Sequence, residues 1–230
     1  MEFVRQCRLL TGHYIRIEFA QPERLISSLL FSTTILLIFI FSMGKTEPNL
    51  VPNLFIAESF LTGFFALQIS FARSLEPDTQ DEVYSLMRTY PLSPSAWFTS
   101  KYCLVVMTGT LVMFPTILVA AFFHLEARVP LLHPEIFLIA FLALIGLAAI
   151  GVLLSTMMLG ANTRQILYPI IYFPLTCPVL ISAVEASRAI IDGTQDLSTL
   201  FSSWLGLLLI FDIIYCTIGF LLFGELTKAD

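Results

Sequence analysis

The sequence predicts an all-α integral membrane protein with six transmembrane helices, preceded by a helix that lies on the membrane surface. Two observations predict this class. Apolar residues make up 57% of the chain and charged residues only 13%, about half the ~25% of charged residues found in soluble domains. Six separate apolar stretches also reach the roughly 20 residues that a helix needs to cross a bilayer.

The expected spans cover residues 25–43, 53–72, 102–123, 135–159, 165–184 and 204–223. We expect them to form one transmembrane domain over residues 1–230. If the N-terminus is cytoplasmic, only three of the 12 Lys and Arg residues fall in external connections: Lys45, Arg128 and Arg188. Cytoplasmic loops are enriched in Lys and Arg, so we predict that the N-terminus, and with six spans also the C-terminus, is cytoplasmic.

Residues 1–22 have the pattern of an amphipathic helix. Apolar residues recur on one helical face, and basic residues lie on the opposite face. The apolar positions are Phe3, Cys7, Leu10, Tyr14 and Ile17, and the basic ones are Arg5, Arg8 and Arg16. Such a helix, joined directly to a span, is expected in the headgroup plane. A frayed cytosolic tail is the alternative.

The cytoplasmic connection between the second and third spans predicts a short helix over residues 79–90. Thr79 and Glu82 have the spacing of a capping box. Asp81 favours the positive end of this helix and Arg88 its negative end. The helix carries an apolar stripe of Val83, Leu86, Met87 and Tyr90, and Pro91 ends it. The stripe can be buried on a partner protein or on the protein's own bundle, and we expect docking on a partner.

Two acids lie inside apolar spans, Glu58 in the second and Asp212 near the middle of the sixth. An ionised side chain in mid-membrane costs several kcal/mol, so such residues are functional candidates. Asp212 can line a substrate path or form a contact that moves between helices. A structural acid that is protonated or hydrogen-bonded is the alternative. Glu58 is near the outer end of its span and can reach the interface.

The fifth span holds three prolines, Pro169, Pro174 and Pro178, each of which removes a backbone donor and disturbs the preceding turn. We therefore expect a break in this span. Carbonyls freed in lipid need partners inside the protein, so the span should face other helices or a cavity. In the fourth span, Gly151 and Ser155 form a small-residue pair that permits close helix contact.

The remaining motifs point away from catalysis. The scattered Cys7, Cys103, Cys177 and Cys216 suggest packing residues. His124 and His133 lie together in an outer loop, where they could ligate a metal or haem iron, but with no third ligand in view solvated histidines are favoured. The triplet Gly44-Lys45-Thr46 lacks the glycine of a phosphate-binding loop, because Phe39 stands in its place. We therefore expect no catalytic residue, metal or directly bound cofactor.

Three stretches resemble the CcmB-like permeases, the haem-exporter permease subunits of the cytochrome c maturation ABC transporter, which are of the ABC-2 type. The first runs from Phe71-Ala72-Arg73 through Asp78-Thr79-Gln80-Asp81 to Pro91-Leu92 and Lys101. The second holds Gly146, Gly151, Gly160 and Arg164, and the third is Pro174-Leu175-Thr176-Cys177-Pro178 with Val179-Leu180-Ile181. The resemblance covers about residues 60–185. The chain departs from the family where Asp81-Glu82 replaces an Asp-Gly pair, where Ser85 replaces a Glu, and where Cys177 replaces an aliphatic residue.

This resemblance implies a non-catalytic transporter subunit in the bacterial inner membrane. Two copies would pair with two cytoplasmic ATPase subunits, which bind the ATP, and the 79–90 helix would be the coupling helix seated in the ATPase. A haem-handling membrane subunit and a periplasmic haem chaperone would be further partners, with haem as a possible substrate and no role for nucleic acid. An ABC-2 exporter of lipid, glycan or drug is one alternative. A small secondary transporter is another, although such proteins typically show inverted repeats.

Overall fold

The computed structural model describes residues 2–44, 47, 50–73, 92–124, 131–157, 164–194, 197–201 and 203–226. Within these ranges the chain is helical and holds no strand, which confirms the all-α class. The helices are α1 (Glu2–Ala20), α2 (Glu23–Met43), α3 (Val51–Arg73), α6 (Pro94–Phe123), α7 (Pro134–Met157), α8 (Arg164–Ile191), α9 (Leu197–Leu200) and α10 (Trp204–Leu226).

Six of these helices, α2, α3, α6, α7, α8 and α10, are long and apolar enough to cross a membrane. This confirms the six predicted spans. The largest differences from the predicted bounds are at α6, which begins at Pro94 instead of residue 102, and at α8, which continues to Ile191 instead of residue 184. Proline suits the first turn of a helix, where its missing N–H has no intrahelical partner. The first turns of α6 mix apolar and polar residues, so hydropathy alone places the start too late.

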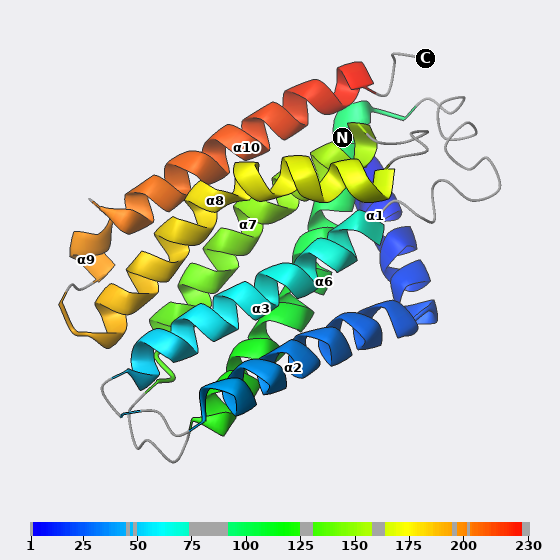
Figure 1. Ribbon diagram of the computed structural model, residues 1–230. Helices are drawn as coiled ribbons and strands as arrows, with labels where there is room; N and C mark the ends of the chain where they lie inside the picture. The colour runs from blue at the N-terminus through cyan, green and yellow to red at the C-terminus, as the bar shows by residue number, and fades with distance from the viewer. Residues whose placement is uncertain are drawn as a thin grey trace.

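Figure 1 shows the six spans packed side by side, with α1 lying across one end of the bundle rather than along it. The last turn of α10 lies at this same end, which we call the α1 end. The connections α2–α3, α6–α7 and α8–α10 lie at the opposite, far end. Among the described residues, the α1 end is thus marked by α1 and the far end by the short α9.

The spans differ in how much of their surface the protein covers. About 72% of the most apolar part of α7 is buried inside the bundle, against 17% for α2. Large apolar side chains on the outer helices, among them Ile38 and Phe41 of α2 and Ile213 and Leu221 of α10, are exposed. Exposed apolar side chains on a spanning helix face lipid tails, which solvate them as well as a protein core does.

Close packing at the centre relies on small residues of α7. At Gly151 a Cβ atom would lie 2.8 Å from the Phe71 ring of α3. One turn later Ser155 Oγ donates a 3.1 Å hydrogen bond to the Phe71 carbonyl oxygen. The predicted close contact at Gly151 and Ser155 is confirmed, and its partner is α3.

The prediction that the fifth span is broken is wrong, because the helix is not interrupted. The helix α8 continues through Pro169, Pro174 and Pro178, although Figure 1 shows that it bends part-way along its length. Side-chain hydroxyls supply hydrogen bonds in this stretch: Thr176 Oγ1 donates to the Tyr172 carbonyl at 2.9 Å, and Tyr215 of α10 donates to the Leu175 carbonyl at 2.7 Å. Prolines can bend a membrane helix without ending it, and the Tyr215 hydrogen bond also ties α8 to α10.

Candidate functional site

The helix α1 is attached to the first turns of α6 by hydrogen bonds. Ser93 N–H donates to Gln6 Oε1 at 3.2 Å, and Ser100 Oγ donates to the Cys7 carbonyl at 3.3 Å. Tyr14, from the apolar face predicted for this helix, is buried. The frayed-tail alternative is therefore wrong, and part of the apolar face is covered by the protein's own α6.

A buried lysine stands at the centre of this contact. Lys101 of α6 has 0% of its surface exposed, and its Nζ lies 3.7 Å from the centroid of the Tyr14 ring. Trp97 Nε1 donates a 2.9 Å hydrogen bond to the Tyr14 hydroxyl oxygen. A cation held against an aromatic face is stabilised by the ring's quadrupole, the more so when water is excluded. This arrangement fixes α1 relative to α6.

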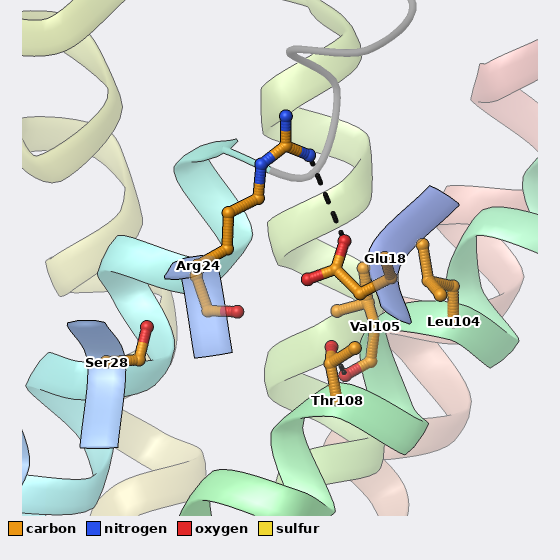
Figure 2. Close-up of a pocket in the computed structure, with 7 residues that line it drawn as sticks. Glu18, Arg24, Ser28, Leu104, Val105 and Thr108 are labelled. Atoms are coloured by element: carbon orange, nitrogen blue, oxygen red, sulfur yellow. Dashed lines mark hydrogen bonds and ion pairs between the residues drawn. The ribbon is translucent and has the colours of Figure 1, made fainter. Parts of the chain in front are cut away.

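Glu18 and Arg24 face each other across a small recess where α1, α2, α3 and α6 converge (Figure 2). The Arg24 Nη1 atom lies 3.9 Å from Glu18 Oε2. The cavity volume is about 10 Å³, roughly the room that one water molecule needs. The recess is lined by Glu18, Arg24, Ser28, Ser70, Leu104, Val105 and Thr108.

The electrostatics of the recess are set mainly by burial. Burial raises the pKa of the Glu18 carboxyl above its ordinary value, and the charges of Arg24 and Lys101 oppose this rise. One carboxyl group and two cations, from α1, α2 and α6, therefore lie near one another in surroundings largely closed to solvent. On the α3 side the recess is close to the connection between α3 and α6, because Ser70 lines it and α3 ends at Arg73.

The predicted short helix belongs to that connection and lies outside the described residues. This holds for all the positions singled out in it: Asp81, Glu82, Val83, Leu86, Met87, Arg88, Tyr90 and Pro91. Its docking surface stays a prediction.

At the far end, Glu58 is buried and paired. Its Oε2 lies 3.0 Å from His124 Nε2 at the end of α6, and only 3% of its surface is exposed. The expectation that His124 is solvated is wrong, because its ring pairs with the buried Glu58 carboxyl group. Nearby, Arg188 Nε of α8 donates a 2.8 Å hydrogen bond to Asn53 Oδ1 of α3. The far end of α3 is therefore joined to both α6 and α8.

Asp212 lies in the interface between α10 and α7. Its carboxyl group contacts the backbone of Gly146, where a Cβ atom would overlap Oδ1 and lie 3.3 Å from Cγ. Within the described residues, neither carboxyl oxygen has a hydrogen-bonding side chain. Gly146 thus makes room for the acid, which faces the bundle interior as intramembrane acids generally do.

The cysteines differ from their expected packing role. Cys103 and Cys177 are exposed on the bundle surface, and Cys7 and Cys216 are only partly buried. Among the described residues, no group of three or more His, Cys, Asp and Glu side chains comes together as a metal site would require.

Sequence reasoning missed the role of three residues: Lys101, His124 and Gly146. The expected third span begins at residue 102, which places Lys101 in the cytoplasmic connection, whereas the structure places it inside α6. His124 is 66 positions from Glu58, and no local pattern links the two. For Gly146 the sequence offers only the resemblance, and no local pattern links it to Asp212.

The comparisons with known proteins agree with this architecture. A family model described as "CcmB protein" matches residues 6–222, nearly the whole chain, while a comparison with curated proteins finds no significant match. The match begins in α1 and extends into the last membrane helix, α10. The chain therefore belongs to the CcmB family and is a multi-pass permease subunit of the ABC system for haem export and cytochrome c maturation.

Proposed function

We propose that this permease subunit couples ATP hydrolysis by a separate ATPase to haem export or to release of a haem-loaded chaperone. The helix predicted over residues 79–90 is the coupling helix in this proposal, with Val83, Leu86, Met87 and Tyr90 as its ATPase contact. Haem is the substrate, passing through this subunit or through a haem-handling membrane subunit that it moves.

One observation supports coupling at this position most directly. The connection that contains residues 79–90 joins the end of α3 to the start of α6. The last turn of α3 lines the recess where Glu18 and Arg24 meet through Ser70, and α6 lines it further along, at Leu104, Val105 and Thr108. Lys101 and Tyr14 then link α6 to α1. A displacement of the coupling helix would therefore be passed to α1, α2, α3 and α6 together, as a rigid-body movement requires.

Charge supports a cytoplasmic location of the α1 end. Arg5, Arg8, Arg16, Arg24 and Lys101 all belong to helices or turns at that end, whereas Arg188 is at the far end. By the positive-inside rule, the N- and C-termini are cytoplasmic and the far end is periplasmic, in the bacterial inner membrane. The full assembly would add a second copy of the chain, two ATPase subunits and a periplasmic haem chaperone.

The test is co-purification of the ATPase subunit with the double variant Leu86→Asp and Met87→Asp. We expect ATPase binding to be lost, because two carboxylates cannot be buried in an apolar groove without partners. The matched control is Leu50→Asp with Leu132→Asp, which introduces the same charges at two exposed apolar positions of the far end and should leave ATPase binding unchanged.

Unchanged ATPase binding in the Leu86/Met87 variant would disprove the coupling role of this helix. Equal loss in both double variants would point to general disruption and also count against it. A pull-down from native membranes, followed by a haem assay, distinguishes the possible substrates. Recovery of cytochrome c maturation partners and haem supports the proposal. Recovery of an ATPase together with bound lipid, glycan or drug favours the other ABC-2 exporters.

A further inference from the structure

The face of α1 that points away from α6 carries a stripe of basic residues, which we call the basic face. It consists of Arg5, Arg8, Leu9, Gly12, His13 and Arg16, which together line a shallow surface groove. Their spacing of three or four residues places them on adjacent turns of one helical face. From Arg5 to Arg16 the stripe extends over roughly 16 Å, at 1.5 Å per helical residue.

The arginines of the basic face are available for a ligand. Within the described part of the chain, no hydrogen bond or ion pair occupies Arg5, Arg8 or Arg16, whereas Arg24 faces Glu18 and Arg188 contacts Glu185. All three arginine side chains are exposed. At Gly12, in the middle of the stripe, an added Cβ would meet no atom within 4 Å, so the groove is open there.

The chemistry of this face fits phosphate. The planar guanidinium group presents paired donors that match two phosphate oxygens, and it keeps its charge in partly apolar surroundings. Three such groups in one row can each take a separate phosphate.

The apolar neighbours of the arginines favour a membrane over an acidic protein surface. Leu9 and Phe19 are 65% and 56% exposed, respectively, and both lie on the same side of α1 as the arginines. At the membrane boundary, apolar side chains can enter the acyl region while basic side chains meet headgroups. An acidic protein surface would satisfy the charges but leave these two side chains against polar groups. Figure 1 shows that α1 leads directly into the spanning helix α2, which keeps α1 at the membrane boundary.

We propose that the basic face of α1 binds the phosphate groups of anionic phospholipids in the leaflet at the α1 end. The opposite face of α1 is fixed to α6 through Tyr14 and Lys101. Bound lipid therefore anchors the first turns of α6 to the membrane plane. This anchoring requires neither haem nor the ATPase, so it can fail or hold independently of the proposed transport function.

The experiment is native mass spectrometry of the full chain in detergent, titrated with phosphatidylglycerol and separately with phosphatidylcholine. We expect the wild-type chain to retain phosphatidylglycerol preferentially. The double variant Arg8→Gln with Arg16→Gln should lose most of this preference, because each arginine near an anionic surface contributes about fivefold in affinity. The charge-conserving variant Arg8→Lys with Arg16→Lys should keep most of the preference and shows that the fold tolerates changes there.

The matched control is Lys45→Gln with Arg128→Gln, which removes the same charge from the far-end connections and should keep the lipid preference. An unchanged preference in the Arg8/Arg16 glutamine variant overturns the proposal, as does an equal loss in both glutamine variants. If the Arg8/Arg16 glutamine variant keeps its lipid preference but no longer co-purifies with the ATPase, the basic face binds an acidic protein surface and not lipid.

Discussion

The far end of the bundle and the middle of the α7–α10 interface each bury an acid, but they accommodate it differently. Glu58 is 3% exposed and Asp212 4% exposed. Glu58 has a side-chain partner in His124, whereas Asp212 rests against the glycine backbone at Gly146. The two acids are therefore equally buried in different ways. Glu58 makes a polar contact with another helix, whereas Asp212 occupies the space that the missing side chain of Gly146 leaves.

Filling the space at Gly146 should have the largest effect. We expect Gly146→Leu to destabilise the protein by about 1–3 kcal/mol or more, as overpacking does, because its side chain would occupy the positions of Asp212 and Val179. Thermal denaturation in detergent, followed by the amount of monodisperse protein, measures this change. Gly12→Leu is the control, since a Cβ there meets no neighbour.

Adding Asp212→Ala to Gly146→Leu should recover part of the lost stability. Full wild-type stability of Gly146→Leu alone would mean that α7 and α10 do not approach at this point.

Removal of the histidine partner should have the next largest effect. His124→Ala leaves the buried Glu58 without its side-chain contact, and we expect a loss of about 1–2 kcal/mol, near the upper range for polar contacts between membrane helices. A double-mutant cycle with Glu58→Gln measures the coupling between the two residues. His13→Ala, at an exposed position of α1, is the control. Strictly additive effects of the two changes would refute the contact.

Neutralising Asp212, the acid that lies against Gly146, should change the stability of the protein little. Asp212→Asn keeps the shape of the side chain and removes its capacity for charge, so we expect stability within about 0.5 kcal/mol of wild type, or above it. The same thermal measurement is used, with cytochrome c yield recorded in parallel. A loss as large as that of His124→Ala would show that Asp212 has a partner and that the contrast between the two acids is wrong.

A third acid, at the α1 end, should give the smallest effect and a dependence on pH. Burial raises the pKa of Glu18 in the folded protein, so the folded state binds the proton more tightly than the unfolded state does. The stabilisation that the Glu18 carboxyl contributes is therefore complete when the pH is below its ordinary pKa. It decreases as the pH rises through the raised pKa of the folded protein. We expect Glu18→Gln to lack this fall, with a net effect below about 1 kcal/mol, because the Arg24 contact it removes is long.

Melting temperatures of wild type and Glu18→Gln, measured from pH 4.5 to pH 8, test this expectation. The variant should gain on wild type towards the upper end of the range. A gain towards the lower end would mean that Arg24 and Lys101, and not burial, control the group.

The sequence was sufficient for the spans but not for their contacts. Continuous apolar stretches identified all six helices, and the face containing Tyr14 identified α1. The pattern gave the wrong result where a helix begins in mixed sequence, as at Pro94, and where a helix continues through prolines, as α8 does. Glu58 and Asp212 were recognised as unusual, but the nature of their surroundings was not. The docking stripe around Leu86 remains a prediction.

Span number, order and approximate length were determined by the sequence alone, because the cost of exposing polar backbone to lipid forces each apolar stretch to form its own helix. The tertiary structure decided what each helix face meets. His124 reaches Glu58, Lys101 lies beneath Tyr14, and Gly146 receives Asp212 only because distant helices pack at particular rotations about their axes. Those rotations depend on the fit of many side chains at once, and no local stretch of sequence encodes them.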